Sequence, residues 1–165
     1  MIIFKAIFLQ LFWYIAVVFG KQYQLILFAS SFAIAYLNYF IFKPKISLPH
    51  YSLCLLLFTL YGIGQEALLD YMGLVSYGEK SFPPWPTSLY VVFLCYYGDI
   101  FNYMKNLNFF LLALIGGAGG VAAFFGGEKL SSLTVLDPLY YGGVFISWFF
   151  FFPLSFKIFY TTIKK

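Results

Sequence analysis

The chain has 165 residues, of which 62% are hydrophobic, 25% aromatic and only 10% charged. An average soluble domain carries about 25% charged residues, so this chain has too few charges to cover a soluble surface. Its mean hydropathy of +0.86 leads to the same conclusion. The composition excludes an ordinary soluble domain and indicates a membrane protein.

The basic character of the chain does not indicate nucleic-acid binding. The formal net charge is +4, and all ten basic residues are lysines. They stand between apolar stretches, so they form no basic face of the kind that nucleic acid needs. We expect them to orient the chain in the membrane, with membrane lipids as its surroundings.

Apolar stretches divided by short polar turns predict one all-α domain, a polytopic bundle of six transmembrane helices. The second stretch ends at Lys43-Pro44, since proline disfavours helix in the residue before it. The short first stretch and the ambiguous link over 128–138 leave five or seven spans open. The predicted spans cover about 2–19, 23–42, 52–77, 87–104, 109–125 and 139–160.

The distribution of the lysines predicts the orientation. With six spans, both termini lie on one side of the membrane, where seven lysines fall against three on the other side. Basic residues concentrate in cytoplasmic loops, so we expect both termini in the cytoplasm. The seven residues are Lys5, Lys43, Lys45, Lys105, Lys157, Lys164 and Lys165.

Two carboxylates interrupt the third predicted span. Glu66 and Asp70 are four residues apart and therefore share one face of a helix. Ionisable groups at membrane depth cost about 2.5 kcal/mol or more each, and they usually face the protein interior. We interpret Glu66, beyond mid-membrane, as a candidate proton donor or acceptor, and Asp70, near the outer boundary, as its polar partner. A structural role, with a hydrogen-bonded Glu66 and a solvated Asp70, is the alternative.

Further residues of the outer half are candidates to line a pocket around this pair. They are Tyr77, Trp85 in the proline-rich loop, and the paired Gly119 and Gly120 of the fifth span. Trp85 also suits an interfacial anchor. Gly116 and Gly120 form a GxxxG pattern that lets helices approach closely, so they could equally pack against a helical partner or a second copy.

The inner half is expected to hold a separate polar cluster. Asp99 falls in the fourth span, and Asn38 and Asn102 fall at a similar depth. Interfacial or structural duty is the alternative for Asp99. Lys5, near the start of the first span, is expected to extend its ammonium group towards the interface.

The sequence predicts neither a metal site nor a cofactor. His50 is the single histidine, so a zinc site built from it and the two cysteines would lack ligands. Cys54 and Cys95 lie within predicted spans, where we expect them to act as small apolar residues. The chain also lacks a P-loop, a GxGxxG, an HExxH and a GxSxG motif.

Several scattered motifs resemble the small bacterial inner-membrane proteins grouped as domain-of-unknown-function family 2878. The resemblance implies a multi-pass protein of the inner membrane, without an established activity. Members are often encoded near enzymes that modify fatty acyl chains, which implies work on or beside membrane lipids. The motifs are Gln10-x-x-Trp13, Asp70-x-x-Gly73, Pro83-x-Trp85-x-x-x-Leu89-Tyr90-x-x-Phe93 and Gly116-x-x-Gly119-Gly120-x-x-Ala123-Phe124-Phe125-x-Gly127-x-Lys129-Leu130.

Three functions fit these observations. In the first, the protein binds an acyl lipid, or helps to modify one, in an outer-half pocket around Glu66 and Asp70. The second is a small proton-coupled transporter, in which Asn38 and Asp99 would extend the path across the membrane. The third is a non-catalytic assembly subunit that docks through the face over 116–127. The sequence alone does not decide whether the protein is an enzyme.

Overall fold

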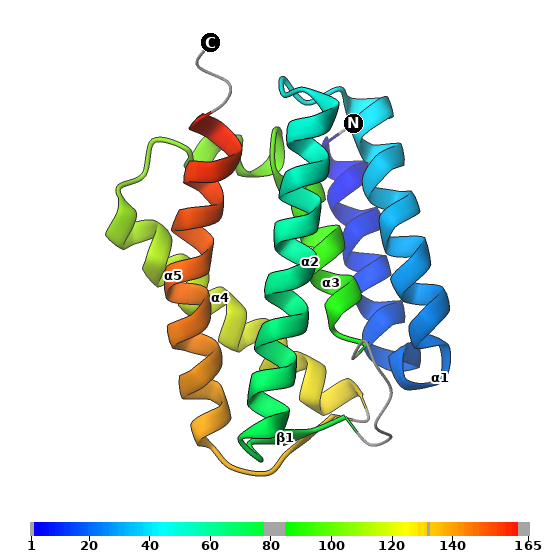
Figure 1. The fold of residues 1–165 in the computed structure, drawn as a ribbon, viewed down its shortest axis with the longest axis vertical. Helices are drawn as coiled ribbons and strands as arrows, with labels where there is room; N and C mark the ends of the chain where they lie inside the picture. Colours follow the sequence, from blue (N-terminus) through cyan, green and yellow to red (C-terminus); the bar gives the residue numbers. More distant parts are fainter. Residues whose placement is uncertain (1, 78–84, 132, 162–165) are drawn as a thin grey trace.

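The computed structural model describes residues 2–77, 85–131 and 133–161. The elements in chain order are α1 (Ile2–Phe42), α2 (Leu48–Tyr71), β1 (Val75–Ser76), α3 (Thr87–Phe93), the 3₁₀-helices η1 (Leu94–Tyr96) and η2 (Ile100–Met104), α4 (Phe109–Leu130), β2 (Thr134–Val135) and α5 (Leu139–Thr161). Figure 1 shows α1, α2 and α5 running roughly along the long axis and α4 crossing obliquely, with the start of α1 and the end of α5 at one end of the molecule. We call this the terminal end and the opposite one the hairpin end.

The first helix is a hairpin of two helices. Its backbone leaves helical geometry at Tyr23, where φ is −121° and ψ is 25°. Figure 1 shows the second half of α1 returning beside the first half. This reversal lies next to the turn over 20–22 that the sequence predicts. Gly20 allows the close approach of Trp85, because a Cβ there would lie 2.6 Å from the indole ring.

The helix α2 corresponds to the third predicted span, but it is displaced from the predicted range of 52–77. It begins earlier, because Ser47 accepts a hydrogen bond from the His50 N–H and caps it. It ends at Tyr71, because Gly73 adopts a positive φ of 69°. The Leu74 N–H bonds to the Leu69 C=O, which is the pattern of a glycine-terminated helix. The chain beyond Gly73 therefore leaves the helix axis.

A short antiparallel ribbon closes the hairpin end. Val75 pairs with Val135, and Ser76 pairs with Thr134. The link over 128–138, ambiguous in the sequence, thus contributes the end of α4 and the strand β2. Part of the proline-rich loop, over 78–84, lies outside the described residues.

The prediction of one continuous spanning helix over 87–104 is wrong. Only seven residues form α3, followed by η1, an extended Tyr97 and η2. Gly98 has a φ of +91°, which a helix cannot accommodate. Irregular backbone at membrane depth is tolerated where protein surrounds it. Tyr97 is buried, and the Gly98 N–H donates to the Tyr160 hydroxyl at 3.1 Å.

The helices α4 (Phe109–Leu130) and α5 (Leu139–Thr161) pack through glycines. A Cβ at Gly117 would lie 2.8 Å from the Phe145 ring, and one at Gly120 would lie 2.6 Å from the Trp148 indole. A Cβ at Gly116 would overlap Phe152. The GxxxG pattern is therefore used for a contact within the chain, between α4 and α5.

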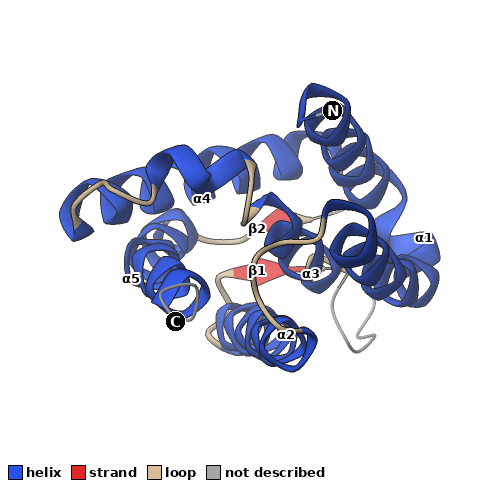
Figure 2. Ribbon diagram, turned by 90° about the horizontal axis from the view of Figure 1, so that it is seen from above, coloured by secondary structure: helices blue, strands red, loops and turns tan. Residues whose placement is uncertain are grey.

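Four helices, α1, α2, α4 and α5, are long and apolar enough to cross a membrane. Their outward faces are apolar, with Ile3 and Leu139 76% and 69% exposed. So many exposed apolar side chains suit contact with lipid and point to a membrane protein. Figure 2 shows α3 in the interior, surrounded by the longer helices.

Candidate functional site

Glu66 is fully enclosed in the protein. Its side chain has no exposed surface, and both carboxylate oxygens accept hydrogen bonds. The Tyr77 hydroxyl donates to Oε2, and the Tyr90 hydroxyl donates to Oε1 at 2.5 Å. The two phenols replace the water that a carboxyl group would otherwise need.

The two tyrosines reach Glu66 from different elements. Tyr77 follows β1, so the turn at Gly73 brings it back beside α2. Tyr90 lies on α3, which approaches α2 closely because a Cβ at Gly62 would lie 2.6 Å from the Tyr90 ring. The Tyr90 ring also stacks on Trp148 of α5, with ring centroids 5.5 Å apart. Three helices therefore position this site.

Asp70 does not share the environment of Glu66. Its side chain is exposed, one turn further along α2. Within the described part of the chain, no hydrogen bond or ion pair joins Asp70 to Glu66. The two acids therefore share a helix face without forming a contact pair.

The other candidate residues differ in their surroundings. Trp85 is 4% exposed and lies against Gly20, inside the bundle rather than at a surface. Gly119 is exposed and Gly120 is buried, and both line a cavity. Tyr77 is a hydrogen-bond partner of Glu66 and belongs to a buried apolar cluster.

The apolar cavity, as we call it, has a volume of about 510 Å³ and lies between α1, α3, α4 and α5. Leu9, Tyr90, Phe93 and Gly120 are among its lining residues. The exposed Gly119 and other exposed lining residues form its rim, so it opens to the surface of the bundle. Tyr90 lines this cavity and its hydroxyl bonds to Glu66, which is not a lining residue, so Tyr90 lies between Glu66 and the cavity.

A second polar group, which the sequence does not single out, ties α2 to α5. Gln65 Oε1 accepts hydrogen bonds from the Tyr61 hydroxyl at 2.7 Å and from the Ser147 hydroxyl at 2.8 Å. Uncharged polar residues are common in membrane helices, so their pattern gave no signal in the sequence. The arrangement joins helices through hydrogen bonds across an apolar interface.

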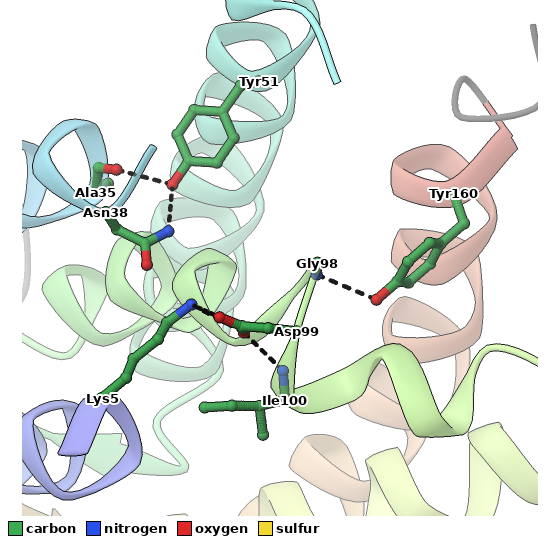
Figure 3. A network of polar contacts seen from close by, with 8 residues as sticks. All are labelled: Lys5, Ala35, Asn38, Tyr51, Gly98, Asp99, Ile100 and Tyr160. Atoms are coloured by element: carbon green, nitrogen blue, oxygen red, sulfur yellow. Dashed lines mark hydrogen bonds and ion pairs between the residues drawn. The ribbon is translucent and has the colours of Figure 1, made fainter. Parts of the chain in front are cut away.

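The terminal end holds a cavity of about 550 Å³ that we call the cationic cavity. Figure 3 shows Lys5 pointing at Asp99, which it contacts at 2.7 Å and 2.9 Å through the two carboxylate oxygens. Asn38 and Asn102 line the same cavity, so the three polar residues expected to cluster lie together. The remaining lining lysines are Lys43, Lys45 and Lys105.

The expectation that Lys5 extends to the interface is wrong. Its side chain is 3% exposed and paired with Asp99, which is 94 residues away in the chain. A buried lysine needs such a partner, because an isolated charge in an apolar interior is costly. The available sequence signal was the presence of a lysine in one predicted span and an aspartate in another, without their pairing.

The apolar exterior, the four helices that could cross a membrane and the enclosed polar groups define a helical protein suited to a bilayer. The family model described as "Protein of unknown function (DUF2878)" matches residues 2–154, which is most of the chain. The chain therefore belongs to this family, and the resemblance inferred from its motifs is confirmed. No curated protein and no solved structure matches the chain significantly.

Proposed function

We propose that this chain is a multi-pass protein of the bacterial inner membrane that binds an acyl lipid. In this proposal α1 crosses twice, α2, α4 and α5 cross once each, and the segment from α3 to η2 completes six passes inside the bundle. The terminal end faces the cytoplasm, because Lys5, Lys43, Lys45 and Lys105 gather there.

The apolar cavity is the observation that carries the proposal. Its volume of about 510 Å³ lies within the range of about 300–1,000 Å³ that is typical of ligand pockets. Its walls are largely aromatic and aliphatic, and its rim lies where the bundle would meet lipid chains. Gln10 offers a polar group at this rim. An acyl chain is the apolar ligand that a bilayer supplies there.

Glu66 takes an indirect part in this proposal. The Tyr90 ring would contact the acyl chain, and Glu66 would hold the Tyr90 hydroxyl and fix the ring. Glu66 remains a candidate proton acceptor through Tyr90. Asp70 is exposed and lies outside this pocket.

The two alternative functions have less support. A proton path from Asp99 to Glu66 would have to pass an aromatic layer, in which Phe58 contacts Phe93 and Tyr97. Docking of a partner through Gly116 and Gly120 would compete with the contact that α5 already makes with these glycines.

A cavity-filling variant tests the proposal. Gly119 lines the cavity and has open space where a Cβ would lie, so we expect Gly119→Leu to obstruct the cavity without a clash at its Cβ. Gly142→Leu is the matched control, because Gly142 is also exposed, has open space and lies outside the cavity lining. Protein in vesicles would be photolabelled with a phospholipid that carries a diazirine on its acyl chain.

We expect labelled peptides from α1, α3 and α4 in the wild type, and several-fold less of this labelling in Gly119→Leu. Gly142→Leu should label like the wild type. Equal labelling of Gly119→Leu and the wild type would refute acyl binding in this cavity.

A further inference from the structure

The cationic cavity is lined by more lysines than carboxylates. Four lysines and one aspartate line it, which leaves a formal charge of +3. The aspartate, Asp99, is already bonded to Lys5. Among the described residues, no ion pair joins Lys43, Lys45 or Lys105 to a carboxylate. The cavity therefore favours an anion.

The positive-inside rule explains why lysines lie in cytoplasmic loops, but it does not explain the buried polar group that lines this cavity. Asn38 is 7% exposed, and its Oδ1 atom has no hydrogen-bond partner among the described residues. Its Nδ2 atom donates to the Tyr51 hydroxyl at 3.4 Å, and that hydroxyl donates to the Ala35 C=O at 2.9 Å. Figure 3 shows the amide oxygen on the side away from Tyr51. A buried acceptor without a protein partner needs a donor from water or from a ligand, and Asn38 lies in the lining of this cavity.

The backbone at Lys43 gives a further indication. Lys43 has a φ of +44°, a conformation that favours glycine over residues with a Cβ. Its N–H bonds to the Tyr39 C=O at 2.9 Å, at the end of α1. A lysine at this position keeps a cation at the cavity wall where a glycine would fit the backbone more easily.

The 3₁₀-helix η2 separates the cationic cavity from the apolar cavity. Side chains three residues apart lie on the same face of a 3₁₀-helix. Phe101 and Met104 line the apolar cavity, whereas Asn102 and Lys105 line the cationic one, together with Asp99 just before η2. Sites suited to a charged group and to an acyl chain therefore lie on two different faces of one short element.

We infer that the cationic cavity binds the phosphate group of an anionic lipid of the cytoplasmic leaflet. Lys43, Lys45 and Lys105 supply ammonium groups to the phosphate, and Asn38 Oδ1 accepts a hydrogen bond from a headgroup hydroxyl. The inference rests on the proposed function, because the acyl chain of the same lipid occupies the apolar cavity. A free phosphate compound shares this headgroup chemistry, and the experiment distinguishes the two sources.

The experiment measures binding by native mass spectrometry of the whole chain in an uncharged detergent. The probes are phosphatidylglycerol, phosphatidylcholine, glycerol 3-phosphate and inorganic phosphate. Lys45→Ala/Lys105→Ala removes two exposed lysines of the cavity. Lys21→Ala/Lys129→Ala removes two exposed lysines that lie outside the cavity lining and is the charge-matched control.

We expect the wild type and the control to bind phosphatidylglycerol in preference to phosphatidylcholine. The Lys45→Ala/Lys105→Ala variant should bind phosphatidylglycerol about 25-fold more weakly, since each of the two lysines contributes about fivefold near an anionic headgroup. Equal weakening in both double variants would overturn the inference. Binding of glycerol 3-phosphate as tight as that of phosphatidylglycerol would overturn the lipid as the source of the phosphate.

The Gly119→Leu variant separates this inference from the proposed function. If Gly119→Leu abolishes acyl labelling while Lys45→Ala/Lys105→Ala binds phosphatidylglycerol like the wild type, only the proposed headgroup site is refuted. If the lysine variant loses phosphatidylglycerol while Gly119→Leu labels like the wild type, acyl binding in the apolar cavity fails and the headgroup site remains.

Discussion

Glu66 is stabilised inside the bundle by two hydroxyl groups that come from outside its own helix. A buried carboxyl group without partners would be expelled or neutralised, and here each oxygen has one donor. Asp70, one turn away, is exposed and does not need such partners. The difference between the two acids lies in their surroundings, since their residue types are almost the same.

Glu66→Leu should lower the free energy of unfolding by about 2–4 kcal/mol, because it leaves the hydroxyls of Tyr77 and Tyr90 buried without an acceptor. Glu66→Gln keeps an acceptor oxygen and should cost less. Asp70→Asn is the matched control and should change stability by less than about 0.5 kcal/mol. Thermal unfolding in detergent micelles measures all three. A loss in Asp70→Asn as large as in Glu66→Leu would contradict this assignment.

Two adjacent glycines of α4, Gly119 and Gly120, have different roles in the packing of this helix. Gly120 lies against Trp148, whereas Gly119, the preceding residue of the same helix, faces open space. One glycine permits the approach of α5, and the other permits the opening of the apolar cavity.

Gly120→Ala should destabilise the protein by about 1–3 kcal/mol, because its Cβ would overlap the Trp148 indole and force α4 and α5 apart. Gly119→Ala is the control with the same change in composition. It should be neutral or stabilise by up to about 1 kcal/mol, since alanine favours helix over glycine. Thermal unfolding of both variants decides the question, and equal melting temperatures would disprove the close contact.

The helical segment that begins with α3 is interrupted at Gly98. A continuous helix over 87–104 would carry the chain past the bundle, whereas the turn at Gly98 places Asp99 opposite Lys5. The positive φ of Gly98 requires a residue without a Cβ, because a Cβ there would also lie 3.2 Å from Pro44.

At the scale of the whole molecule, the Lys5–Asp99 pair joins the start of α1 to the segment that follows α3. Removing one partner of a fully buried pair costs about 3–5 kcal/mol. Asp99 retains 21% of its side-chain exposure, so we expect about 1–3 kcal/mol for Lys5→Ala or Asp99→Ala alone. The double variant should lose less than the sum of the two. Strict additivity in chemical unfolding would show that the pair is not coupled.

The proposed orientation makes a prediction for the whole chain. Lys21, at the hairpin end, and Lys45, at the terminal end, are both exposed. In intact cells, a membrane-impermeant maleimide should label Lys21→Cys but not Lys45→Cys. Both should be labelled after permeabilisation. The native Cys54 and Cys95 are buried and serve as an internal background. Labelling of Lys45→Cys alone in intact cells would reverse the orientation.

The sequence by itself determined the long apolar helices suited to a membrane, the helix starts at Phe109 and Leu139, and the family. Hydropathy is a sum over neighbouring residues, so a local pattern suffices to predict where an apolar helix lies. The same reasoning singled out Glu66 and Asp70 as acids within an apolar stretch, whereas the enclosure of Glu66 and the exposure of Asp70 follow from the packing around α2.

Only the tertiary structure decided which groups meet. The partners of Glu66 are 11 and 24 residues away, and Asp99 meets a lysine 94 residues away. Such pairs depend on where turns such as those at Gly73 and Gly98 direct the chain, and a hydrogen bond forms only within a narrow range of distance and angle. A sequence pattern without partner positions does not contain this information.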